Sequence, residues 1–209
     1  MKEANLVVGM DLGKVSDHTA IAVVEHLWKI EEDRPPTDIY RIGFVHRWPL
    51  ETPYEAIISD LGAIIEEGGF RGAPIIFDAS GIGRTVAKLL HDAHLRRELG
   101  DYMPQPIIIT GAAKMVRNQV PLADLIAAVV APMQTGRLKL AAGLPDGEAL
   151  LRELLTFHTK TTPTGNLSYG SERQRDHDDL VMAVALAVWF RHTRVRPRRI
   201  EEEALKIAM

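Results

Sequence analysis

Residues 173–190 read RQRDHDDLVMAVALAVWF, in which three aspartates and a histidine directly precede an uninterrupted apolar run. A helix that is apolar on all sides is normally buried. Carboxylates repel one another, so their position at the mouth of a buried helix needs a reason. Two reasons are open. Asp178 or Asp179 accepts N–H bonds at the helix N-terminus, or a divalent cation offsets the repulsion.

The composition is that of an ordinary globular protein. The chain has 209 residues, 46% of them hydrophobic and 25% charged, which fits one domain. It has no cysteine, which excludes disulfides, thiolate catalysis and Cys-based metal sites. No N-terminal stretch resembles a signal peptide, and the apolar run Leu180–Phe190 is too short to span a bilayer. We therefore expect a cytoplasmic protein with no membrane role.

Hydrophobic patterning predicts an α/β fold. Three strands at 5–12, 19–25 and 39–48 form an antiparallel meander, and a helix follows between Pro53 and Gly68. Strands at 74–80 and 104–110 then alternate with a helix that runs to about Leu99. Helical periodicity follows at about 120–135 and 146–157, then a polar hairpin or loop at 159–171 and the final helix with the apolar run. This order predicts a mixed five-stranded sheet, with three antiparallel strands and then parallel strands, and with helices on both faces.

Two lone carboxylates come at the ends of predicted strands. Asp11 follows LVVGM and Asp78 follows PIIF, each with glycine close behind. Taken singly, each can be a turn former, because Asx side chains bond nearby backbone N–H groups. Adjacent central strands would bring the two together, and a helix N-terminus across the sheet would add Asp178 and Asp179. Such oxygen donors suit Mg²⁺ or Mn²⁺, and two ions ~4 Å apart would stabilise both the attacking and the leaving oxygen of a phosphoryl displacement.

Three segments together carry a resemblance to a known family. GMDLGKVSDHTAIAVVE, IIFDASGIG and HDDLVMAVALAVW resemble, in order and spacing, the three acidic motifs of the nuclease domain of tailed-bacteriophage terminase large subunits. The likeness extends to about His192. It implies a ribonuclease H-like fold for residues 1–192, with residues 193–209 as a basic-then-acidic tail. It also implies metal-dependent endonuclease cleavage of double-stranded DNA during viral genome packaging, in the host cell cytoplasm.

The resemblance also implies roles for individual residues. Asp11 would bridge two Mg²⁺ or Mn²⁺ ions, Asp78 would hold one, and Asp178 or Asp179 would hold the other. Asp17 would be a supporting ligand, whereas His177 is either a ligand, a phosphate contact or only part of the helix cap. Four cations flank these motifs and either bind DNA phosphates or are ordinary solvated charges: Lys114, Arg117, Arg173 and Arg175.

One departure from the family limits what this polypeptide does alone. Terminase large subunits normally carry an ATPase motor, but this chain has no G-x-x-x-x-G-K-[ST] motif. We expect a separate motor domain or subunit, with portal and small terminase proteins as further partners. The alternatives are a Holliday-junction-resolving nuclease of the same fold, an ATP-binding domain of the actin and sugar-kinase type suggested by GMDLG, and a silent binding module. GIGR at 81–84 lacks the third glycine of a dinucleotide site.

Overall fold

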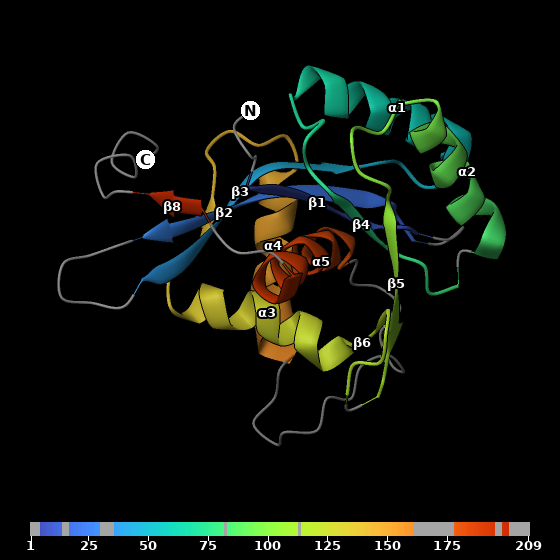
Figure 1. Cartoon of the computed structure of the whole chain (residues 1–209). Coiled ribbons are helices and arrows are strands. Elements are labelled where there is room, and N and C mark those ends of the chain that lie inside the picture. Colours follow the sequence, from blue (N-terminus) through green and yellow to red (C-terminus); the bar gives the residue numbers. More distant parts are fainter. Residues whose placement is uncertain are drawn as a thin grey trace.

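The computed structural model describes residues 5–13, 17–29, 36–81, 83–112, 114–160, 178–194 and 198–200. Within them one sheet has the strand order β6-β5-β4-β1-β2-β3-β7, and β8 pairs with the far end of β2 (Figure 1). The strands are β1 (Leu6–Asp11), β2 (Ala20–Lys29), β3 (Thr37–Arg47), β4 (Ile75–Asp78), β5 (Gln105–Thr110), β6 (Gln119–Pro121), β7 (Leu138–Leu140) and β8 (Arg198–Ile200). The helices are α1 (Tyr54–Glu67), α2 (Gly83–Leu95), α3 (Leu122–Gln134), α4 (Gly147–Lys160) and α5 (Asp179–Arg194).

The sheet topology confirms the predicted order of pairing. β1, β2 and β3 form an antiparallel meander, while β4 runs parallel to β1 and β5 runs parallel to β4. The predicted count of five strands is wrong, because β6, β7 and β8 also join the sheet. Each of these three has only three residues, too few to show an alternation in the sequence. The helix expected to reach Leu99 ends earlier, at Leu95.

Helices cover both faces of the sheet, as expected (Figure 1). α1 and α2 lie on one face, while α3, α4 and α5 lie on the other. Side chains of β1 alternate between the two cores, since Val7 packs with the α5 side and Val8 and Met10 pack with the α1 and α2 side. β1 is therefore buried on both faces, which suits a central strand of a mixed sheet.

α5 is the buried helix that the apolar run predicts. Every residue from Leu180 to Phe190 is buried, because the helix lies between the sheet and the pair α3 and α4. Among the strand residues on this side of the sheet, Gly9, Ala20 and Ala22 are small. Small residues let the helix approach the sheet closely enough to exclude water on all sides. No helix in the described ranges is both long and apolar enough to cross a membrane.

Candidate metal centre

Asp11 and Asp78 end two adjacent, parallel, central strands. Met10 of β1 pairs with Phe77 of β4, and each aspartate is the next residue along its strand. The carboxyl ends of parallel strands lie at the same edge of a sheet, so the two aspartates share that edge. Both are partly exposed there, whereas the strand residues just before them are buried.

The N-terminus of α5 brings the second pair of carboxylates. Asp179 is the first residue of the helix and is only 5% exposed, and Asp178 directly precedes it. The carbonyl oxygen of Asp178 accepts the first helical hydrogen bond, from the N–H of Met182 at 2.8 Å. Since α5 packs across β1 and β4, its first turn carries both aspartates toward the edge that Asp11 occupies.

The pKa of Asp11 reports the resulting electrostatics. It lies well above the ordinary value, first because the carboxyl is desolvated by burial and then because of the neighbouring charges. Four carboxylates contribute to this rise, in decreasing order Asp78, Asp179, Asp178 and Asp17. Charges from all three acidic motifs therefore affect the Asp11 carboxyl group. Removing any one of them would lower the pKa of Asp11.

Asp78 also has the turn role that was open for it. Its Oδ1 accepts a hydrogen bond from the N–H of Ser80 at 2.7 Å, and the Ser80 hydroxyl accepts one from the N–H of Ile109 at 2.7 Å. Gly81 follows with a φ of 89°, a backbone conformation that glycine tolerates best. The turn after β4 is thus tied to β5, which holds the Asp78 backbone in place while its carboxylate lies beside Asp11.

The other expected site residues are placed less completely. Asp17, Lys114 and Arg117 are exposed, Asp17 just before β2 and the two cations between β5 and β6. Arg173, Arg175 and His177, together with the polar segment 161–177, lie outside the described residues. In the part of the chain that is described, no three His, Asp or Glu side chains already converge on a point that could hold an ion.

Glu153 is a buried acidic residue near this centre that the motifs do not include. It lies on α4 and is 7% exposed. Burial raises its pKa to about 7, the N–H of Val181 and the charge of Arg47 lower it, and the charge of Asp179 raises it. A signal for Glu153 does exist in the sequence. It falls on the same helical face as the buried residues Leu150, Leu154 and Phe157, where an unpaired carboxylate would be costly.

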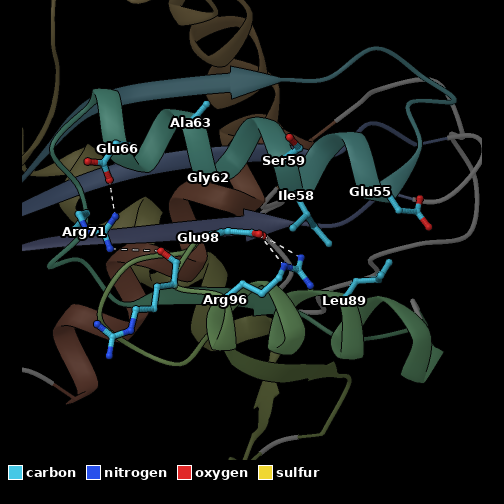
Figure 2. A pocket seen from close by; sticks show the side chains of 11 residues that line it. Glu55, Ile58, Ser59, Gly62, Ala63, Glu66, Arg71, Leu89, Arg96 and Glu98 are labelled. Carbon is cyan, nitrogen blue, oxygen red and sulfur yellow. Dashed lines mark hydrogen bonds and ion pairs between the residues drawn. The ribbon is translucent and has the colours of Figure 1, made fainter.

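A groove between α1 and α2 lies away from these carboxylates (Figure 2). It has a volume of about 570 Å³, and its walls carry both signs of charge. Arg71 pairs with Glu66, and Arg96 pairs with Glu98 at 2.7 Å. Its charges are thus largely satisfied among themselves, and none of the acidic motif residues lines it. The candidate active site is therefore at the carboxyl ends of β1 and β4 and not in this groove.

Three of the solved structures with a similar fold are viral nuclease domains. The chain is similar to the large terminase nuclease of thermophilic phage G20c (TM-score 0.52, 19% identity, 94% of this chain and 85% of that chain covered). It is also similar to the human cytomegalovirus terminase nuclease domain, Mn soaked (0.53, 11%, 90% and 84%). A third is the large terminase nuclease domain of bacteriophage SPP1 with bound Mn (0.52, 15%, 91% and 88%).

These likenesses establish the fold. At 11–19% identity they show the architecture alone, a mixed sheet with helices on both faces, which this chain shares with the nuclease domains of viral terminases. No protein-family model matches the sequence, and no curated protein matches it either.

Proposed function

We propose that this chain is a divalent-metal-dependent endonuclease that cleaves double-stranded DNA, of the kind that cuts viral genomes during packaging. One observation carries the proposal. The charges of Asp78, Asp179, Asp178 and Asp17 all raise the pKa of Asp11, so three distant motifs act on a single carboxyl. The ribonuclease H-like fold, shared with nuclease domains of viral terminases, supports the same conclusion.

The residues present fit a divalent cation. The donors are carboxylate oxygens with no thiolate, which is the set that Mg²⁺ and Mn²⁺ prefer. Burial first, and then the charges of the neighbouring carboxylates, raise the pKa of Asp11, and a cation would offset this repulsion. Asp11, Asp78 and one or both of Asp178 and Asp179 would hold two ions, with Asp17 as a supporting ligand. Bound there, the ions would supply Lewis-acid stabilisation of the oxygens at the scissile phosphate.

The chain's own residues would bind the metal ions and orient the DNA. Asp11 and Asp78 approach from rigid strand ends, and Asp178 and Asp179 approach from the first turn of a buried helix. The exposed Lys114 and Arg117 would bind DNA phosphates beside this centre, together with Arg173 and Arg175. No side chain is needed as a covalent nucleophile.

In this proposal residues 1–192 form the nuclease, and 193–209 form an appended tail. A motor domain or subunit would drive translocation, because the chain has no P-loop motif of its own. Portal and small terminase proteins would be the further partners of such a nuclease.

Plasmid cleavage tests the proposal directly. Wild type, Asp11→Asn and the matched exposed control Asp101→Asn are incubated with supercoiled plasmid in EDTA, Mg²⁺ or Mn²⁺. We expect nicking and linearisation by the wild type and the control only with metal, and none by Asp11→Asn. Thermal unfolding should show that Mn²⁺ stabilises the wild type but not Asp11→Asn, because an ion that binds only the folded protein shifts the equilibrium toward it.

The outcomes separate the alternatives. A wild type that leaves both plasmid and four-way junctions intact with either metal contradicts a nuclease function. Cleavage of junctions alone would favour a resolvase, and stabilisation by ATP without any cleavage would favour the nucleotide-binding alternative.

A further inference from the structure

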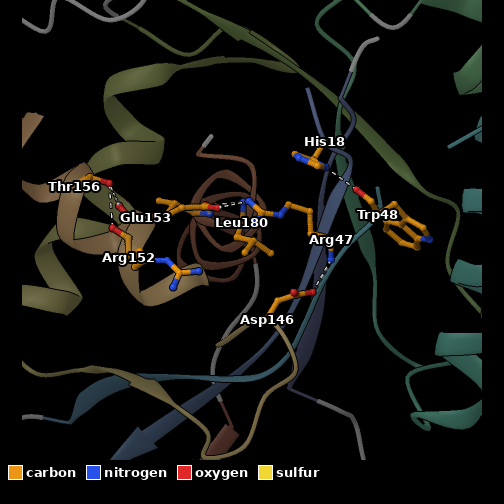
Figure 3. A network of polar contacts seen from close by, with 9 residues as sticks. His18, Arg47, Trp48, Asp146, Arg152, Glu153, Thr156 and Leu180 are labelled. Carbon is orange, nitrogen blue, oxygen red and sulfur yellow. Dashed lines mark hydrogen bonds and ion pairs between the residues drawn. The ribbon is translucent and has the colours of Figure 1, made fainter. Parts of the chain in front are cut away.

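Glu153 of α4 lies directly at the N-terminus of α5 (Figure 3). Its Oε2 accepts hydrogen bonds from the N–H groups of Leu180 at 3.0 Å and Val181 at 3.2 Å. Its Oε1 accepts one from Nη1 of Arg47 at 2.9 Å. Both oxygens of this buried carboxylate are therefore engaged, one by the helix that carries Asp179 and one by the end of β3.

These contacts replace an ordinary helix cap. The first N–H groups of a helix have no partner within it, and a nearby side chain usually accepts from them. Here the acceptor comes from a different helix, so the first turn of α5 is fixed in relation to α4. Asp178 and Asp179 precede the bonded N–H groups, so their backbone is held by the same bonds.

Arg47, the last residue of β3, makes two contacts in this network. Its main-chain N–H donates to Oδ2 of Asp146, just before α4, at 2.9 Å, while its guanidinium bonds Glu153 (Figure 3). Arg47 therefore ties the end of β3 both to the residue before α4 and to Glu153 within α4. The positive charge of Arg47 also balances Glu153, which would otherwise add another negative charge beside the acidic motifs.

We propose that Glu153, held by Arg47, is a positioning residue that fixes Asp178 and Asp179 in the orientation in which they bind metal with Asp11 and Asp78. The inference rests on the proposed nuclease function. Both oxygens of Glu153 accept hydrogen bonds from backbone N–H groups and a guanidinium. It acts through the position of the α5 backbone.

The test is Glu153→Gln, compared with wild type and with Glu148→Gln, an exposed residue in the first turn of the same helix. The amide keeps one oxygen for the two N–H groups but turns an NH₂ group toward the Arg47 donor. We expect Mn²⁺ affinity, measured by calorimetry, to fall about 10-fold and cleavage to fall about 10- to 100-fold. Amide hydrogen exchange of Leu180 and Val181 in the metal-free protein should become faster, and Glu148→Gln should match the wild type.

A second variant tests the same contact in case Glu153→Gln does not fold. Arg47→Lys keeps the charge on a partly exposed side chain but loses the planar guanidinium, and it should weaken Mn²⁺ binding in the same direction. The double variant should be little worse than either single variant, because both break one contact.

Two results overturn the inference in distinguishable ways. If the wild type binds Mn²⁺ and cleaves DNA, and Glu153→Gln has a lower melting temperature but the same affinity and rate, then Glu153 is merely structural. If the wild type neither binds Mn²⁺ nor cleaves, the proposed function and the positioning role are overturned together.

Discussion

A Cβ atom added to Gly9 would lie 2.0 Å from the carbonyl oxygen of Ala183, so the backbones of β1 and α5 are in direct contact. The neighbouring N–H of Ala187 would be 2.9 Å away. Neither atom belongs to a side chain that could rotate aside. The distance between the central strand and the buried helix, and hence between Asp11 and Asp179, is therefore set by the absence of a side chain at this position.

Gly9→Ala should accordingly destabilise the protein by about 3 kcal/mol, since overpacking a core forces the backbone to shift. The free energy of unfolding in urea measures it. Gly43→Ala is the matched control, because this glycine of β3 has no atom within 4 Å of an added Cβ. Its stability should change by less than about 1 kcal/mol. Equal losses in the two variants would contradict close packing as the cause.

Asp179→Asn should abolish metal-dependent cleavage and leave the metal-free protein equally stable or more stable. The reason is that the charge of Asp179 helps to raise the pKa of Asp11, so removing it relieves repulsion. Plasmid cleavage and thermal unfolding in EDTA measure the two effects. Asp124→Asn, in the first turn of α3, is the control and should keep full cleavage. Clear destabilisation of Asp179→Asn with normal cleavage would instead favour a structural role.

His26, at the opposite end of β2 from the metal centre, should make the free energy of unfolding depend on pH. It is 1% exposed, stacks on Tyr40 and bonds Oδ1 of Asp38 at 2.8 Å. Burial lowers its pKa below the ordinary value of 6.5, although Asp38 raises it in part. A histidine with a lowered folded-state pKa contributes stability above pH 6.5 and loses it as pH falls through that folded-state value.

The pH dependence of unfolding in urea between pH 5 and 7.5 tests this contribution. His26→Gln should lose less stability on acidification than the wild type does. Asp38→Asn should lose more, because it removes the partner that favours the protonated ring. Parallel pH profiles for all three proteins would show that His26 does not titrate with folding.

The exposed cations between β5 and β6 predict a salt-dependent contact with DNA. Lys114→Gln and Arg117→Gln should each weaken duplex binding regardless of sequence. Each should also reduce the slope of log affinity against log salt by about 0.9, the value for one phosphate contact. Fluorescence anisotropy over a range of salt concentrations measures it. Lys139→Gln on β7, at the other edge of the sheet, should leave the slope unchanged.

Much of the architecture follows from local patterns in the sequence. Apolar, β-branched runs predict the buried strands, and an apolar run with helical length predicts a buried helix. The adjacency of Asp11 and Asp78 follows too, because both end strands that belong at the centre of such a sheet. The three missed strands, β6, β7 and β8, are too short to carry a pattern. Two of them, β7 and β8, also form by pairing with strands distant in sequence, β3 and β2.

The cap of α5 could not be predicted in the same way. The sequence offers Asp178 and Asp179 as candidate caps, whereas in the structure the N–H groups of Leu180 and Val181 donate to Glu153. Helical periodicity alone places Glu153 on a buried face. Its partners come from β3 and α5, and only the tertiary arrangement brings them together.

The contact between the start of β1 and the end of α5 has a consequence for how the molecule is made. Asn5 accepts a hydrogen bond from Arg191, 186 residues later in the chain. During synthesis the strands that carry Asp11 and Asp78 leave the ribosome long before the helix that carries Asp179. Contacts of such long range are the slow ones to form. In the proposed nuclease, the ability to cut DNA would therefore arise only when α5 docks on the sheet.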